Sequence, residues 1–248
     1  MLSDPLTLAY IAVSFFLAGA VKGAVGMGLP TMSLGLMTLM LEPRMAITLV
    51  LIPMMTTNAW QVYRAGEIPR ALRHYAPFAL SLIVFVGLSV WLTFGAPERL
   101  LMGIMGVAIL VFVAVNASKW APQIPAHRDR AAQIIAGIAA GIMGGITSVW
   151  APPMAIYLAA RRTPKEEFVR ASGLLIFIGS LPLAVGYIRQ GYMTPQLAVI
   201  GTALLIPAML GFALGERARH SLSEQAFRRA LLVAFAAMAL NLLRRAVF

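Results

Sequence analysis

The stretch Gly19-Ala20-Val21-Lys22-Gly23-Ala24-Val25-Gly26-Met27-Gly28-Leu29-Pro30 interrupts a long apolar segment with four glycines and a proline. Its Lys22 is the only charged residue between Asp4 and Glu42. A second segment, 131–160, carries no charge and is interrupted by Gly141-Ile142-Met143-Gly144-Gly145-Ile146-Thr147-Ser148-Val149-Trp150-Ala151-Pro152-Pro153. Glycine and proline both weaken a helix, so each segment is predicted to be a discontinuous membrane helix. Broken helices at corresponding positions of two halves are typical of a transporter's binding site.

The composition of the chain predicts an all-α polytopic membrane protein. Hydrophobic residues make up 60% of its 248 residues and charged residues 12%, against about 45–50% and 25% in a soluble domain. The net charge of +11 comes from Lys and Arg beside apolar segments, where they orient the protein and meet membrane lipid, so nucleic-acid binding is not expected. Cysteine is absent, which excludes disulfides and thiol chemistry.

Six segments have the length of an ordinary membrane-spanning helix, about 20 residues. They are approximately 45–64, 74–94, 98–116, 170–190, 195–215 and 226–247. The segments 6–41 and 131–160 are each too long for one such helix, and the second is too short for two. Split at its glycines, 131–160 gives pieces of about 14 residues, roughly 21 Å each. Such pieces either turn back at the middle of the bilayer or form one badly broken helix.

The placement of Lys and Arg favours segments that turn back. In that case one face of the membrane receives 14 basic residues and the other receives 5, whereas crossing segments give 10 and 9. The larger set is Arg64, Arg70, Arg73, Lys119, Arg128, Arg130, Arg161, Arg162, Lys165, Arg170, Arg217, Arg219, Arg228 and Arg229. The positive-inside rule then predicts a multi-pass protein of the cell inner membrane with both termini periplasmic. Arg244 and Arg245 fit this topology least well.

This topology makes the two halves inverted repeats, each a re-entrant helix pair plus three transmembrane helices. We expect the first repeat at 1–116, a polar cytoplasmic linker at 117–130 and the second repeat at 131–248, within one integral membrane domain. Four sequence matches recur in the same order at an offset near 121–126 residues. They are Gly23 and Pro30 with Gly144 and Pro152, Pro43-Arg44 with Pro164-Lys165, Tyr63–Ile68 with Tyr187–Met193, and Pro97-Glu98-Arg99 with Ser223-Glu224-Gln225.

The two breaks are the predicted substrate-binding site, because unwound backbone in a membrane must face protein or water. Pro30 and Pro152 suit the first turn of each second half-helix, whose free amides would favour an anion. Thr147 and Ser148 would add hydroxyls at the cap position. Small residues would let a compact ligand approach the backbone, or alternatively only allow close helix packing. These small residues are Gly23, Gly26, Gly28, Gly144 and Gly145, with Met27 between two of them.

Three further side chains complete the predicted site, each with a simpler alternative. Lys22 would attract an anion near the midplane, or pack beside a carbonyl, or reach an interface. Asn58 would contact substrate, although an interhelical hydrogen bond explains it equally well. Trp150 would cap or gate the site, or belong to the ordinary core.

No enzyme, cofactor or metal site is predicted. The nine acidic residues fall near loops or helix ends, so no buried carboxylate offers a proton relay or a sodium ligand. His74, His127 and His220 are equally peripheral, and an intramembrane hydrolase would need such groups clustered at depth.

At both breaks the chain resembles the TauE/SafE family of sulfite-exporter-like membrane permeases. The resemblance rests on Gly23–Pro30, on Gly144–Pro153 and on Tyr63–Ile68, and it covers nearly the whole chain. It implies about eight membrane helices and movement of sulfite or organosulfonates across the inner membrane. The resemblance therefore implies a secondary transporter that exports a small anion by alternating access. The alternatives are a passive anion channel and a membrane scaffold without transport activity; monomer and homodimer both stay open.

Overall fold

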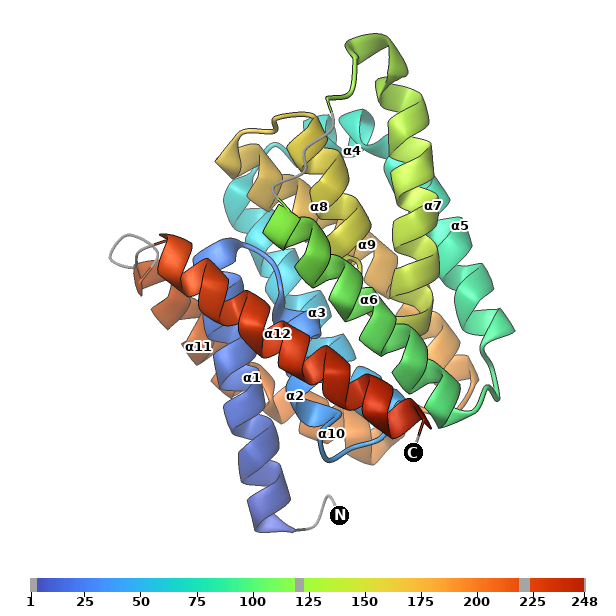
Figure 1. Ribbon diagram of the computed structural model, residues 1–248, viewed down its shortest axis with the longest axis vertical. Helices are drawn as coiled ribbons and strands as arrows, with labels where there is room; N and C mark the ends of the chain where they lie inside the picture. Colours follow the sequence, from blue (N-terminus) through green and yellow to red (C-terminus); the bar gives the residue numbers. More distant parts are fainter. Residues whose placement is uncertain (1–3, 119–122, 219–223, 248) are drawn as a thin grey trace.

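A computed structural model describes residues 4–118, 123–218 and 224–247, and every regular element in these ranges is a helix (Figure 1). The helices are α1 (Pro5–Val25), α2 (Leu29–Met37), α3 (Pro43–Ala65), α4 (Ile68–His74), α5 (Ala76–Leu92), α6 (Glu98–Ser118), η1 (Ala126–Arg128), α7 (Asp129–Thr147), α8 (Ala151–Ala160), α9 (Lys165–Arg189), α10 (Pro195–Ala203), α11 (Leu205–Ala218) and α12 (Glu224–Val247). Lys119, Arg219, His220 and Ser223 lie outside the described residues.

The prediction of a polytopic helical membrane protein is confirmed. Six spans in the described ranges are long and apolar enough to cross a membrane, or seven if α4 and α5 form one span bent by 74°. They are not the six predicted segments, because α1 and α7 are now among them. The segment predicted at 195–215 is α10 and α11, which are separated only by Leu204.

Each broken segment folds back on itself, but with arms of unequal length. The hydroxyl of Tyr10, near the beginning of α1, donates to the carbonyl of Leu36 in α2 at 2.7 Å. Likewise the hydroxyl of Tyr157 in α8 donates to Asp129, the first residue of α7, at 3.0 Å. The prediction of two arms of about 14 residues in 131–160 is wrong, since α7 has 19 residues and α8 has 10. At 1.5 Å per residue α7 is about 28 Å long, nearly the thickness of the hydrocarbon core.

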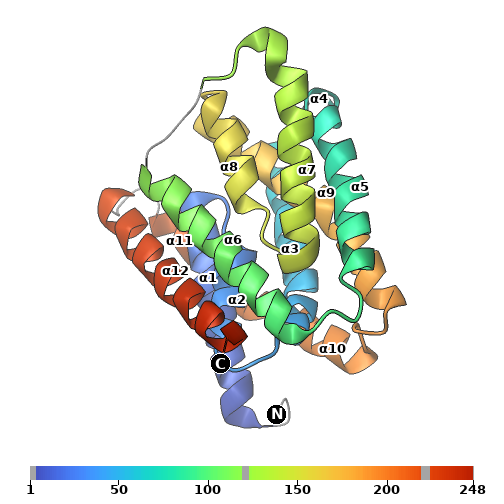
Figure 2. The ribbon, with the colours of Figure 1, turned by 45° about the vertical axis from the view of Figure 1, so that its right-hand side comes forward.

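Glycines let the long arms pack closely against neighbouring helices. α1 lies along α11, and α7 lies along α5 (Figures 1 and 2). A Cβ atom on Gly23 of α1 would lie 2.8 Å from the backbone nitrogen of Glu216. A Cβ atom on Gly145 of α7 would lie 2.8 Å from the carbonyl oxygen of Val86. These small residues therefore bring helix backbones together, as they commonly do in membranes.

The same order of elements occurs in both halves of the chain. A broken helix is followed by a long helix, a short and a longer helix, and a final long helix, first in α1–α6 and then in α7–α12. The two central helices, α3 and α9, pack against each other, and so do the two last helices, α6 and α12. In Figure 1 the beginning of α1 and the end of α12 lie at the lower end of the molecule, while α7 begins at the upper end.

The arginines that fitted the predicted topology least well have partners at the lower end of the molecule. Arg245 donates to the carbonyl of Thr38, directly after α2, and Arg244 donates to Asn241 at 3.1 Å. A cation beside the carboxyl end of a helix is favourable, because the last carbonyls carry partial negative charge. Arg245 is thus held by a contact with the end of α2, which counting basic residues on each face of the membrane could not predict.

Candidate functional site

The first break spans Gly26, Met27 and Gly28, between α1 and α2. Gly26 has φ 92° and Gly28 has φ 107°, conformations that residues with a side chain rarely adopt. The amide of Gly26 donates to the carbonyl of Lys22 at 2.7 Å and closes the last turn of α1. Pro30 stands in the first turn of α2, as predicted. Within that turn the amides of Leu29 and Thr31 have no acceptor inside the helix.

The second break spans Ser148, Val149 and Trp150, between α7 and α8. Ser148 has φ 59°, and its amide donates to the carbonyl of Gly144 at 2.8 Å. The hydroxyl of Thr147 accepts from the amide of Val149 at 3.1 Å and donates to the carbonyl of Met143 at 2.7 Å. The prediction that Thr147 and Ser148 cap the second half-helix is therefore wrong. They end α7, and Trp150 occupies the cap position of α8.

The amino end of α8 offers few backbone donors. Pro152 and Pro153 both stand in its first turn and carry no N–H, so Ala151 supplies the one amide of that turn. An indole donor lies next to it. Trp150 is 2% exposed, and no atom in the described part of the chain accepts a hydrogen bond from its Nε1. A buried donor without an acceptor costs about 1–3 kcal/mol, so it points to a ligand group or a water at this position.

Lys22 is a fully buried cation whose hydrogen-bond partner is neutral. Its side chain is 1% exposed, and its Nζ donates to the Oδ1 of Asn58 at 2.5 Å. Asn58 is itself fully buried and donates through Nδ2 to the carbonyl of Met54 at 2.7 Å. Over the described ranges Lys22 forms no salt bridge. Isolated buried charge is expensive unless an opposite charge joins it.

Gln61, one turn after Asn58 on α3, fixes the first break to the central helices. Its Nε2 donates to the carbonyl of Gly26 at 3.1 Å and to the carbonyl of Val169 in α9 at 2.6 Å. Its Oε1 is buried and has no donor among the described residues. The sequence places Gln61 in a polar patch of an apolar span, which indicates a buried polar role. It does not show that the side chain of Gln61 reaches the first break.

One face of α3 connects both breaks. Met54 accepts a long hydrogen bond from the hydroxyl of Ser148 through its sulfur, at 3.9 Å. One turn later Asn58 holds Lys22, and Gln61 holds Gly26. The structure therefore brings together the two breaks that the sequence predicts to face each other.

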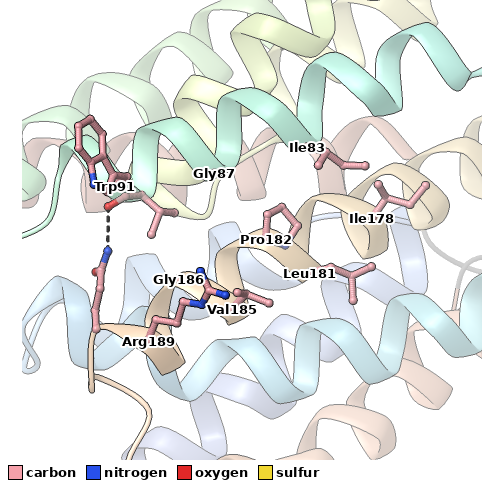
Figure 3. A pocket seen from close by; sticks show the side chains of 11 residues that line it. Ile83, Gly87, Trp91, Ile178, Leu181, Pro182, Val185, Gly186 and Arg189 are labelled. Carbon is pink, nitrogen blue, oxygen red and sulfur yellow. Dashed lines mark hydrogen bonds between the residues drawn. The ribbon is translucent and has the colours of Figure 1, made fainter.

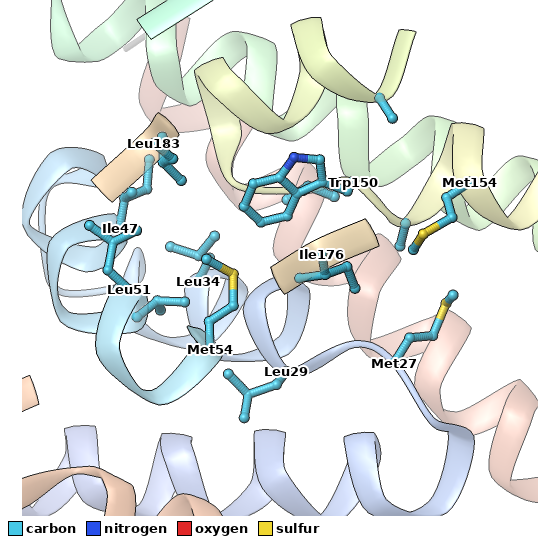
Figure 4. Packing of buried hydrophobic residues seen from close by; sticks show 14 of the residues in the cluster. Met27, Leu29, Leu34, Ile47, Leu51, Met54, Trp150, Met154, Ile176 and Leu183 are labelled. Carbon is cyan, nitrogen blue, oxygen red and sulfur yellow. The ribbon is translucent and has the colours of Figure 1, made fainter. Parts of the chain in front are cut away.

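Apolar side chains fill the region between the breaks. Met27 and Leu29 of the first break share one buried cluster with Trp150 and Met154 of the second (Figure 4). Ile176 of α9 packs into the same cluster. A ligand can therefore reach these backbones only after side chains move.

The predicted glycines do not all face this cluster. Gly23 and Gly145 lie in the helix contacts with α11 and α5, which favours the packing alternative for both. A Cβ atom on Gly144 would overlap the indole of Trp150, so this glycine makes room for the tryptophan. Gly26 and Gly28 form the turn of the first break. No set of three His, Cys, Asp or Glu side chains in the described ranges is placed to hold a metal ion.

A hollow of about 1200 Å³ with many charged lining residues opens at the upper end of the molecule, between α4, the beginnings of α5, α7 and α9, and the end of α8. We call it the vestibule. Its basic residues are Arg70, Arg73, Arg130, Arg161 and Arg170, and its acidic residues are Glu67, Asp129, Glu166 and Glu167. At its base Tyr157 and the Nε of Arg161 both bind Asp129, at 3.0 Å each. Tyr75 lies edge-on to Tyr157, with ring centroids 6.5 Å apart.

Comparison with known proteins identifies one family. The family model described as Sulfite exporter TauE/SafE matches residues 11–242, a range that includes both breaks and reaches from α1 to α12. No curated protein and no solved structure matches the chain.

Proposed function

Because the chain belongs to the sulfite exporter TauE/SafE family of membrane transporters, we propose that it is a secondary transporter exporting sulfite or an organosulfonate. The observation that carries this proposal is the buried ammonium of Lys22, which has a neutral partner and lies one turn before the first break. An anion bound there would supply the missing opposite charge.

The donors around the breaks suit an oxyanion. The free amides in the first turn of α2 lie at the positive end of a helix, where anions bind favourably. The unpartnered indole N–H of Trp150 supplies a donor from the other half of the chain. A sulfur oxyanion presents several acceptor oxygens, so it can use donors from both breaks at once. In this proposal Asn58 has both roles that the sequence suggests. It forms an interhelical hydrogen bond that positions Lys22, and it lies within reach of the same ligand.

Alternating access is the proposed mechanism, with α1–α6 and α7–α12 acting as inverted repeats. The opposite starting ends of α1 and α7 in Figure 1 support this arrangement, as does the pairing of α3 with α9. Rocking of one repeat against the other would expose the breaks to each side in turn. Both termini are then periplasmic, and the vestibule lies on the face with the larger set of basic residues, which the positive-inside rule assigns to the cytoplasm.

Anions would approach the breaks through the vestibule. Tyr157 stands two turns after Trp150 on α8, about 10 Å along the helix axis. Its ring packs against Phe78 at a centroid distance of 5.7 Å and against Tyr75. We infer that these three rings close the path between the vestibule and Trp150, since Tyr75 and Tyr157 both line the vestibule. Opening toward the cytoplasm would release Tyr157 from Asp129, because that bond ties α8 to α7.

Flux from proteoliposomes tests this function. The purified chain should release sulfite, thiosulfate, sulfoacetate or taurine with a rate that saturates, and the transported anion should compete with the others. Runs with and without a pH gradient show whether a proton is coupled. Flux that rises linearly with anion concentration would instead identify a passive channel. Flux equal to that of empty liposomes for every compound would overturn the assignment to sulfur anions and favour the scaffold.

A further inference from the structure

An apolar groove of about 610 Å³ runs along the outer surface between α5 and α9 (Figure 3). Its apolar walls include Trp91 and Ile83 of α5, which are 71% and 39% exposed, and Val185 of α9, which is 49% exposed. Arg189 and Gln190, at the end of α9, lie at one end of this groove. The groove is separate from both breaks.

Gly87 creates the groove. No atom lies within 4 Å of the position that a Cβ on Gly87 would take, so the space beside it is open. Toward the end of α9 the two helices meet, because a Cβ on Gly186 would overlap the side chain of Val90. The side-chain amide of Gln190 also donates to the carbonyl of Val90 at 3.1 Å (Figure 3). The groove is thus open along the membrane-facing surface and closed beside Arg189.

The charge of Arg189 is not matched by its neighbours in the structure. Arg64, at the corresponding end of α3, pairs with Glu216 of α11 at 2.9 Å. Arg189 takes part in no salt bridge within the described ranges, and α5 contains no acidic residue. In Figure 3 its side chain runs along α9 beside Gly186 and Val185. A cation therefore stands at the polar end of an apolar groove.

We propose that this groove binds an anionic phospholipid. One acyl chain lies in the space beside Gly87, and the phosphate receives hydrogen bonds from the guanidinium of Arg189. The planar guanidinium can bind two phosphate oxygens at once. Arg189 ends a membrane-spanning helix, which is the level at which lipid phosphates lie. The site is independent of the transport function, because it uses no residue of the two breaks.

Native mass spectrometry of the purified full chain in detergent tests the site. The probes are phosphatidylglycerol, phosphatidylcholine with the same acyl chains, and inorganic phosphate. We expect phosphatidylglycerol to bind more tightly than phosphatidylcholine. Arg189→Gln should weaken phosphatidylglycerol binding about fivefold, the factor that one basic residue contributes at a membrane surface. Arg189→Lys keeps the charge but not the planar fork, so it should restore only part of the difference. The exposed Arg99→Gln, at the same end of the molecule, should leave the difference unchanged.

A second variant tests the acyl-chain part of the site. Gly87→Leu fills the open space without meeting another atom at Cβ, so it should weaken the binding of both phospholipids while the protein still elutes as a single species. Equal losses from Arg189→Gln and Arg99→Gln would overturn the proposal, because they would show only general surface attraction. Unchanged phosphatidylglycerol binding in Gly87→Leu, or displacement of the lipid by inorganic phosphate alone, would overturn it as well.

Discussion

Replacing Lys22 with methionine separates the charge of this residue from its packing. Methionine is unbranched, similar in length and able to fill an irregular apolar space. The change removes the hydrogen bond from Nζ to the Oδ1 of Asn58 and leaves that oxygen buried without its donor. The change also removes a buried charge, and replacing a buried charged side chain by an apolar one of similar size is often neutral or favourable for stability.

The change affects folding and anion binding differently, because only the loss in folding is partly offset. An unsatisfied Asn58 oxygen costs about 1–3 kcal/mol of stability, and relief of the buried charge offsets part of this loss. The loss of anion binding has no such offset. Unit charges about 4 Å apart attract by about 4 kcal/mol at an effective dielectric constant of about 20, and dehydration of the anion leaves about 1.5–3 kcal/mol of net contact. Affinity should therefore fall about 10- to 150-fold.

The assay is saturable anion flux in proteoliposomes, with thermal unfolding measured on the same preparations. Lys22→Met should raise the half-saturating anion concentration about 10- to 150-fold, in line with the lost contact, and shift the unfolding temperature only slightly. Lys165→Met, which removes an exposed lysine at the beginning of α9, should change neither quantity. If Lys22→Met transports with unchanged half-saturation, the assignment of the ammonium to the anion is wrong. The double variant Lys22→Met/Asn58→Leu removes the unpaired oxygen and should regain stability but not affinity.

Three further predictions concern Trp150, Gly144 and the orientation of the chain in the membrane. Trp150→Phe removes the unpartnered Nε1–H and should raise the half-saturating anion concentration about tenfold in the flux assay. An unchanged concentration would mean that Trp150 only packs in the core and does not bind the anion. Gly144→Ala should cost about 1–3 kcal/mol in thermal unfolding, because its Cβ would overlap the indole. By contrast, Gly103→Ala, with its nearest neighbour at 3.6 Å, should change stability by less than about 1 kcal/mol. Because the chain has no cysteine, Arg73→Cys and Arg99→Cys can be labelled singly with an impermeant thiol reagent. Labelling of both from one side of the membrane would contradict the proposed topology.

Local sequence signals located most helix ends. Pro43 begins α3, close to the predicted start at 45, whereas α9 begins at Lys165, directly after Pro164 and five residues before the predicted start at 170. Gly66 and Gly191 both have positive φ after a long helix. These features depend on residues within one or two turns, such as a proline that can stand only in a first turn or a glycine that permits a left-handed conformation. They could therefore be predicted without knowing what packs against them.

The unequal arms of the broken helices could not be predicted in the same way. Several glycines in 131–160 are equally able to end a helix, and sequence alone does not choose among them. In the structure Gly137, Gly141 and Gly145 continue α7, because each lies against α5 where a larger side chain would not fit. The helix ends only at Ser148. Tertiary packing thus decides which glycines serve as contacts and which as breaks.

The two halves contribute different chemistry to the proposed site, although their elements occur in the same order. The position of Lys22 in the first half corresponds to Met143 in the second, so only one break has a cation beside it. The second break has two prolines in the first turn of α8, which remove amides that the first break retains, and it has an indole donor instead. If the two repeats rock against each other, the anion stays beside Lys22 of the first repeat. Its hydrogen bonds to donors of the second repeat, such as the indole of Trp150, change. The half-saturating anion concentration should then differ between the two sides of the membrane, whereas the electrochemical gradient sets the direction of net flux.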